Sequence, residues 1–249
     1  MGDTTNLYKD VTKAKWPLVS VIVPVHNEEG VLASTLESLC NQVYTGDKPE
    51  IIVALNGCHD KSRDVARRFS LKILDDRKCG MGFGKNLGAS AAVGDILLFV
   101  DADTTLPASA IQQIVQAMQP YKRAICTVRG RPENGGPVVR ACFHIANWYA
   151  RRKRVQSIGP VLAVHRAVFD AIHGFDERIK QGTGTDFIMR ALASGAAYVF
   201  LDAVCATTSI RRFKRVGMIR QLLSWRTNHH LLAAGRYDEL QQREYDAIR

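Results

Sequence analysis

Residues 96 to 107 read Ile-Leu-Leu-Phe-Val-Asp-Ala-Asp-Thr-Thr-Leu-Pro, and this stretch decides the fold. Its five apolar residues predict a strand that is buried on both faces, as in the interior of a parallel sheet. Two carboxylates, Asp101 and Asp103, follow at once, and Pro107 can open a helix. Paired negative charge at the end of a buried strand favours a cation site. A simple Asx turn or helix cap stays open as the alternative.

The first half of the chain repeats this pattern of a strand followed by a helix. Runs of β-branched residues and apolar spacings of three and four residues mark the elements. The predicted strands are 17–24, 50–55 and 71–74, and the predicted helices are 28–40, 61–70, 85–93 and 107–118. Such alternation is typical of a parallel sheet with helices on both faces, in which ligands bind at the carboxyl ends of the strands. Asp101 and Asp103 are expected at that edge.

Beyond residue 120 the pattern is looser. Residues 143–155 are predicted to be helical, residues 159–169 to be a strand that runs into a helix, and residues 197–201 to be a strand. The turn-rich segment 130–137 predicts a loop.

Composition limits the class of protein. A chain of 249 residues with 46% hydrophobic residues fits one α/β domain. No apolar run approaches the roughly 20 residues of a membrane span. Six cysteines without any Cys-x-x-Cys spacing predict neither a zinc site nor a disulfide scaffold, and favour a cytoplasmic location. The formal charge of +10 calls for a polyanionic partner, such as nucleic acid, a phosphorylated substrate or anionic lipid.

The glycine-rich segment from Cys79 to Asn86 matches neither common phosphate-binding motif. A Walker loop would need glycine at Cys79 and a hydroxyl residue at Asn86. The glycines at 80, 82 and 84 also lack the spacing of a dinucleotide-binding fingerprint and lie outside the first strand–helix–strand unit.

Four segments together resemble the ordered signatures of family 2 glycosyltransferases, which belong to the nucleotide-diphospho-sugar transferase superfamily. They are Val19 to Glu29, Asn56-Gly-Cys-His-Asp60, Gly94 to Asp103 and Gly174-Phe-Asp-Glu177. The resemblance covers roughly residues 18–215. It implies the GT-A fold, a Rossmann-like α/β fold with a mostly parallel central sheet and helices on both faces.

The resemblance also implies a division of the chain. A polar lead-in (1–16) would precede a GT-A domain (17–210), made of a nucleotide-binding half (17–119) and an acceptor-binding half (120–210). A basic helical segment (211–249) would follow. Its arginines alternate with apolar residues up to residue 226. This segment would either lie on anionic lipid at the inner membrane face or pack its apolar side on the core.

The resemblance assigns a donor site. Glu28 would accept hydrogen bonds from the ribose hydroxyls, unless it only caps the next helix. Asn56 would read the base, and Lys85 would lie near the nucleotide, unless it is a solvated lysine. Arg211 or Arg212 would fold over the diphosphate. The residues expected to contact the nucleotide are Pro24, His26, Glu28, Asn56, Lys85, Asp101, Arg211 and Arg212.

Asp101-Ala-Asp103 matches the Asp-x-Asp motif of the family. Loss of a nucleoside diphosphate develops negative charge on its β-phosphate, which a divalent ion neutralises. Asp103 is the expected direct ligand of Mn²⁺ or Mg²⁺. Asp101 is expected nearer the ribose or a metal-bound water.

The acceptor side departs from the family pattern. Many relatives carry Glu-Asp-x-Asp followed by an arginine, and the first Asp is the catalytic base. Here Thr183 and Gly184 replace the Glu-Asp pair. Asp186 would act as the base after a local shift, or it simply pairs with Arg190 across one helical turn. Asp176 and Glu177 are expected to line the acceptor site.

The resemblance therefore implies an inverting, metal-dependent transfer of a hexosyl or related group from a UDP- or GDP-sugar to an unknown hydroxyl acceptor. One alternative is a non-catalytic nucleotide-binding relative that has lost its base. Another is a nucleotidyltransferase, although Pro24 to Glu29 lacks the glycine-rich basic loop of that class. Nucleic acid is not expected as a partner, because no aromatic residues interleave with the basic cluster from Arg151 to Arg154.

Overall fold

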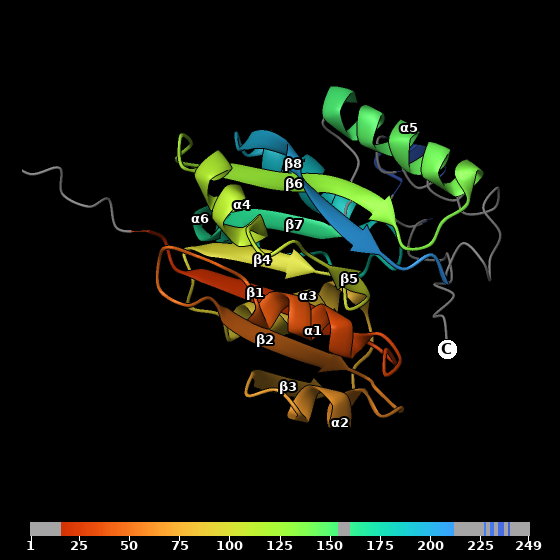
Figure 1. Cartoon of the computed structure of the whole chain (residues 1–249). Helices are drawn as coiled ribbons and strands as arrows, with labels where there is room; N and C mark the ends of the chain where they lie inside the picture. The colour runs from red at the N-terminus through yellow and green to blue at the C-terminus, as the bar shows by residue number, and fades with distance from the viewer. Residues whose placement is uncertain are drawn as a thin grey trace, which may run out of the picture.

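The computed structural model describes residues 16–153 and 160–211, together with residues 227, 230, 231, 234–236 and 239. Within these residues, one mixed sheet has the strand order β3-β2-β1-β4-β7-β6-β8-β5 (Figure 1). The strands are β1 (Val19–Val25), β2 (Glu50–Asn56), β3 (Lys72–Asp76), β4 (Ile96–Val100), β5 (Thr104–Thr105), β6 (Ala124–Pro132), β7 (Val161–His165) and β8 (Ala197–Thr208). The helices are α1 (Leu32–Cys40), α2 (Ser62–Arg67), α3 (Met81–Ser90), α4 (Ala110–Met118), α5 (Pro137–Lys153), α6 (Arg166–Ala171) and α7 (Thr183–Ala193).

The direction of the strands confirms the α/β fold with a mostly parallel sheet. β3, β2, β1 and β4 pair in parallel. β7 is antiparallel to both of its neighbours, β4 and β6, and β8 is parallel to β6. β5 is a short antiparallel strand beside β8. The carboxyl ends of β1, β2, β4, β6 and β8 therefore point toward the same edge.

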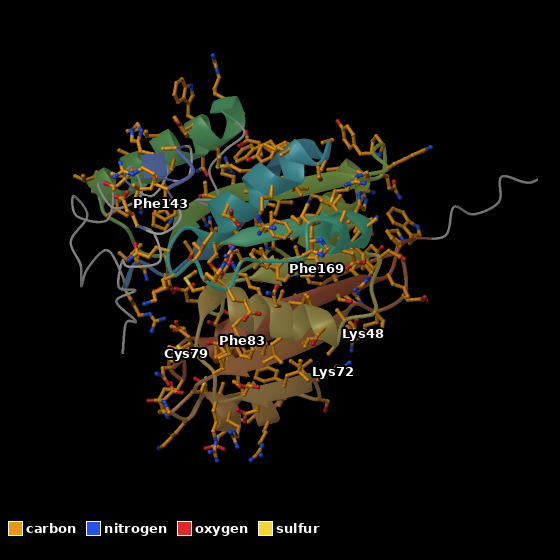
Figure 2. All side chains as sticks on the ribbon, turned by 180° about the vertical axis from the view of Figure 1, so that it is seen from behind. Lys48, Lys72, Cys79, Phe83, Phe143 and Phe169 are labelled. Atoms are coloured by element: carbon orange, nitrogen blue, oxygen red, sulfur yellow. The ribbon has the colours of Figure 1, made fainter. Side chains whose placement is uncertain are left out.

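Two apolar cores cover the two faces of the sheet. Val21 and Val23 of β1 pack on one face with residues of α1, α2 and α4. Ile22, which points the other way, packs with residues of α3, α6 and α7. This second core contains an aromatic group in which the rings of Phe175 and Phe187 stack with centroids 4.3 Å apart. Figure 2, seen from behind, labels Phe169 of this group over the middle of the sheet. Burial on both faces explains why these strands are continuous apolar runs.

The glycine-rich segment is a helix, which corrects the prediction of a loop with a helix starting at Lys85. α3 begins at Met81. A Cβ at Gly88 would lie 2.3 Å from Cγ2 of Ile22, and one at Gly84 would lie 2.1 Å from Nδ2 of Asn56. Glycine is a poor helix former, but here it lets the helix lie against β1 and β2.

Other boundaries also differ from the prediction. The first helix begins at Leu32 rather than Glu28. β6 was not predicted, and it includes the first three residues of the predicted loop 130–137, after which α5 begins at Pro137. The lead-in and the basic segment 211–249 lie almost wholly outside the described residues. Among the helices described, none has the length and apolar character needed to cross a membrane.

Candidate functional site

β4 ends in the turn that carries the two predicted carboxylates. The amide of Asp101 donates to the carbonyl of Pro160 (3.0 Å), and the amide of Thr104 donates to the carbonyl of Asp101 (3.1 Å). Both carboxylate residues are partly exposed. This backbone turn holds both carboxylates at the carboxyl edge of the sheet, while the Asx turn or helix cap given as the alternative stays a prediction.

The end of β8 is tied to this turn. Thr104 and Thr105 of β5 pair with Thr208 and Thr207. The Oγ1 of Thr208 donates to Oδ1 of Asp103 (3.3 Å), and the amide of Ser209 donates to the carbonyl of Asp103 (3.2 Å). This pairing delivers the residues after β8 to the Asp-x-Asp turn, although they lie about a hundred positions away in sequence.

Arg211 therefore reaches the edge of the sheet at which the donor site is predicted. Its guanidinium forms an ion pair with the carboxylate of Glu28, and its Nη2 lies 4.0 Å from Oδ2 of Asp103. Its Nε also donates to Oγ of Ser209 (3.2 Å). The structure thus brings together three predicted donor-site residues from β1, β4 and β8. Arg212 lies outside the described residues.

The residues at this edge fit a divalent metal ion. Asp101 and Asp103 offer hard carboxylate oxygens, and the cationic group of Arg211 already faces Asp103. Across the described part of the chain, no group of three or more His, Cys, Asp or Glu side chains is arranged to hold a metal. An ion on Asp103 would complete its shell with water and phosphate oxygens, as Mg²⁺ usually does in nucleotide sites.

Hydrogen bonds fix the loops that follow β1 and β2, where nucleotide contacts are predicted. His26 donates from Nδ1 to the carbonyl of Asn56 (2.8 Å), which links the ends of β1 and β2. The amide of Glu28 donates to Oγ of Ser62 at the start of α2 (2.8 Å). Pro24 lies against Gly84: a Cβ added at Gly84 would be 3.3 Å from the Cβ of Pro24. Figure 2 labels Cys79 and Phe83 at this side of α3, and Sγ of Cys79 lies 3.6 Å from Nδ1 of His26.

Two polar side chains are buried between α3 and the ends of the strands. Asn56 is 3% exposed and Lys85 is 8% exposed. The Nζ of Lys85 lies 5.0 Å from the ring centroid of Phe175, and within the described residues this ammonium forms no ion pair with a carboxylate. A largely buried lysine that lacks a carboxylate partner favours an anionic ligand at this position.

The loop Gly174–Glu177 is clamped onto α3. Asn86 accepts from the amide of Phe175 and donates to its carbonyl, both at 2.9 Å. Its Nδ2 also donates to Glu177 (3.0 Å), which forms an ion pair with Lys78. Gly174 adopts a φ of +67°, and a Cβ there would lie 2.7 Å from Oδ1 of Asn86. The predicted acceptor-side residues Asp176 and Glu177 are therefore joined to α3, which belongs to the predicted nucleotide-binding half.

The pKa values of the two carboxyls predicted on the acceptor side, Asp176 and Glu177, are lowered. Hydrogen bonds from the side chain of Arg178 lower the pKa of Asp176, against the opposing effect of burial. Burial raises the pKa of Glu177, but hydrogen bonds from Lys78 and Asn86 outweigh it, so that the net pKa is lowered. Both groups are anionic at neutral pH and are weak proton acceptors.

Asp186 pairs with Arg190 inside α7. It is 1% exposed, and its Oδ2 lies 2.9 Å from Nε and 2.7 Å from Nη2 of Arg190. Nη1 of Arg190 donates to the carbonyl of Ile172 (2.7 Å). This is the geometry that the pairing alternative predicts, while the assignment of Asp186 as catalytic base stays a prediction. Thr183, which replaces the Glu expected from the family resemblance, is 2% exposed, and its Oγ1 has no hydrogen-bond partner among the described residues.

The sequence prediction does not include Asn86, since in the sequence this residue appears only as a departure from a Walker loop. Asn86 lies one helical turn after Gly82, where a Cβ would be 3.0 Å from the carbonyl oxygen of Asp176. This spacing of four residues would have placed both on one face, had residues 81–84 been predicted as helix.

Comparison with known proteins adds a family match and several relatives. The family model described as Glycosyl transferase family 2 matches residues 20–171. The probable glycosyltransferase YdaM of Bacillus subtilis is 28% identical over 186 residues, which cover 65% of this chain and 44% of YdaM. Glycosyltransferase AglE of Haloferax volcanii is 27% identical over 210 residues, which cover 79% of this chain and 68% of AglE. The chain thus spans between about half and two thirds of these relatives.

Solved structures show the same fold. TarS of Staphylococcus aureus in complex with UDP has a TM-score of 0.64 and 21% identity, covering 80% of this chain and 63% of that one. The mannosyltransferase PcManGT of Pyrobaculum calidifontis, in complex with GDP-Man and Mn²⁺, has a TM-score of 0.68 and 20% identity. The match covers 79% of this chain and 58% of PcManGT. At this level of identity the likeness establishes the GT-A fold alone.

Proposed function

Since the chain belongs to glycosyl transferase family 2, we propose that it transfers a sugar from a UDP- or GDP-sugar to a hydroxyl group of an acceptor. The observation that carries this proposal is the meeting of Glu28, Asp103 and Arg211 at the carboxyl edge of the sheet. The UDP complex of TarS and the complex of PcManGT with GDP-Man and Mn²⁺ support a nucleotide-sugar donor.

Donor binding uses groups that already lie at this edge of the sheet, after one ion pair between them has opened. The carboxylate of Glu28 accepts hydrogen bonds from the ribose hydroxyls, which requires it to release the guanidinium of Arg211. Arg211 is then available to donate two hydrogen bonds to the diphosphate. The buried amide of Asn56 meets the base, and the ammonium of Lys85 provides positive charge for the phosphates.

The transfer step is a single displacement. The acceptor hydroxyl attacks the anomeric carbon from the side opposite the diphosphate, so that the new glycosidic bond forms as the sugar–phosphate bond breaks and the configuration inverts. Mn²⁺ or Mg²⁺ on Asp103, with Asp101 nearby, would neutralise the charge that develops on the leaving group. Arg211 stabilises the same charge from the protein side. Asp186 takes the proton of the hydroxyl only if it first leaves Arg190.

Calorimetric titration with UDP and with GDP, each with and without Mn²⁺, tests the donor site. We expect one nucleotide to bind, more tightly with Mn²⁺. Asp103→Asn should remove the metal dependence, whereas Asp47→Asn, at an exposed carboxylate before β2, should leave it intact. Binding of neither nucleotide to the wild-type protein would contradict the proposal.

A second candidate is a nucleotide-binding protein without transferase activity. It is favoured by the lack of an available catalytic base. Asp186 is held in an ion pair with Arg190, and Thr183 and Gly184 provide no carboxylate that could act instead. Incubation with UDP- and GDP-sugars and a set of hydroxyl acceptors, with release of the free nucleotide as the readout, separates the two. Metal-dependent binding without release would support the second candidate, and NMR of a product would show whether the anomeric configuration inverts.

A further inference from the structure

Helix α5 buries one face against the sheet. Phe143, Ala146 and Ala150 are at most 7% exposed, and Figure 2 labels Phe143 on the side of α5 that faces the sheet. Asn147 accepts from the amide of Gly130 (3.1 Å) and donates to its carbonyl (2.8 Å), which fixes the helix to β6. Near its end, Arg151 forms an ion pair with Asp202 of β8. The helix is thus firmly seated, and its other face is presented to solvent.

One stripe of the solvent-exposed surface of α5 is apolar. Val138 is 61% exposed, Ile145 is 67% exposed and Trp148 is 54% exposed. With Ala141, which is also exposed, these residues recur at intervals of three, four and three. At about 100° per residue they form one stripe opposite Phe143, roughly 15 Å long. We call these four residues the α5 stripe.

This concentration is unusual within the described residues. Six large hydrophobic side chains are exposed in the described part of the chain, and three of them belong to the α5 stripe. The other three, Val43, Val93 and Tyr121, lie one each on the connections after α1, α3 and α4. A contiguous exposed apolar face indicates an interaction surface, whereas isolated exposed hydrophobic residues are ordinary.

Positive charge borders the α5 stripe. Arg140, which is exposed, lies on one flank of the helix. The guanidinium of Arg152 lies over the ring of Trp148, with Cζ 5.5 Å from the ring centroid. The sequence from residue 134 to residue 169 contains no Asp or Glu. The surface that covers this helix must therefore accept apolar side chains and supply negative charge.

We propose that α5 lies on the surface of an anionic lipid bilayer, with the α5 stripe in the boundary between headgroups and acyl chains. Trp and Ile on one face and arginines beside them are typical of helices that lie in this interface. A second copy of the chain fits less well, because two α5 helices would bring like charges together. The proposal does not depend on the identity of the donor or the acceptor.

Sedimentation of the full chain with vesicles tests the proposal. The vesicles are made of phosphatidylcholine alone or mixed with phosphatidylglycerol. We expect binding to the mixed vesicles, with weaker binding at high salt. The double variant Ile145→Ser/Trp148→Ala should bind about tenfold or more weakly, because it removes most of the apolar area of the stripe.

The matched control is Val43→Ser/Val93→Ser, which removes exposed apolar side chains elsewhere and should bind vesicles like the wild type. Thermal unfolding should be similar for all three proteins, because every substituted side chain is exposed. Equal vesicle binding by the stripe variant and the wild type would overturn the proposal. The proposal would also be overturned if the stripe variant changed its oligomeric state, measured by sedimentation velocity, but bound vesicles like the wild type. That result would assign the α5 stripe to contact with a second copy of the chain.

Discussion

Gly84 lies so close to Asn56 that the methyl group added by Gly84→Ala tests the packing between them. We predict that Gly84→Ala lowers the free energy of unfolding by about 1–3 kcal/mol, because a Cβ would lie 2.1 Å from Nδ2 of Asn56. The displaced amide should also weaken nucleotide binding. Chemical denaturation and calorimetry measure the two effects. Gly30→Ala is the control, since a Cβ there meets nothing within 4 Å. Equal behaviour of the two variants would refute the steric argument.

Substitution of Asp186 distinguishes a structural role of its pair with Arg190 from a role as catalytic base. Asp186→Asn leaves the partly buried guanidinium of Arg190 without its counter-charge, so we predict a loss of about 1–3 kcal/mol of unfolding free energy. If the pair is only structural, the folded variant keeps its turnover number. If Asp186 is the base, turnover falls by roughly 10²–10⁴.

A second variant separates these outcomes when stability is a concern. Asp186→Leu/Arg190→Met replaces the pair by apolar groups, which often restores stability. Recovered stability together with normal turnover would exclude Asp186 as the base.

At the scale of elements, the pairing of β5 with the end of β8 determines where Arg211 lies. We predict that Arg211→Ala weakens UDP or GDP binding by about tenfold or more, because two charge-assisted hydrogen bonds to the diphosphate are lost. Arg211→Lys should recover only part of this affinity. Calorimetry with the matching nucleoside is the control, since it carries no phosphate. Equal losses for nucleoside and nucleotide would show that Arg211 does not act on the diphosphate.

Some elements could be predicted from sequence because their signal is local. β1, β2 and β4 are apolar runs that end near polar residues, and parallel topology then places Asp101 and Asp103 at the ligand edge. α3 was predicted to start too late, because helix propensity penalises glycine while close packing on Ile22 and Asn56 requires it. The antiparallel placement of β7 also depends on pairing with distant strands, which no local pattern records.

In the candidate site, too, contacts between residues close in sequence could be predicted, and contacts between distant residues could not. The contact between Asp186 and Arg190 follows from their spacing of four residues, and the sequence offered it as one alternative. The clamp of Asn86 on Phe175 joins residues 89 positions apart, and the ion pair of Lys78 with Glu177 joins residues 99 apart. Contacts of this kind become visible only when the packing of α3 against the loop is known.

For the whole molecule, lowered carboxyl pKa values predict acid sensitivity. The net pKa is lowered for Asp176, mainly by Arg178, and also for Asp60 and Glu177, where hydrogen bonds outweigh burial. A lowered folded-state pKa stabilises the protein above the ordinary values of 3.8 for Asp and 4.5 for Glu, and this stability is lost as the pH falls through the folded-state values.

We therefore predict that the free energy of unfolding declines as the pH drops below about 4.5. Denaturant titrations from about pH 7 to about pH 3 measure the decline. Asp176→Asn should make it shallower, and Arg178→Gln should do so to a similar degree, because each removes the same stabilising contact. An undiminished slope in both variants would contradict this origin.

The clamp of Asn86 on the loop Gly174–Glu177 also bears on how this chain can be recombined. A chimera with a crossover near residue 120 would take α3 from one parent and the loop from another. It would separate Asn86 from Phe175, Lys78 from Glu177, and Gly82 from the backbone of Asp176. A library that exchanges acceptor halves between homologues should therefore transfer residues 78–86 and 174–177 as one inherited block.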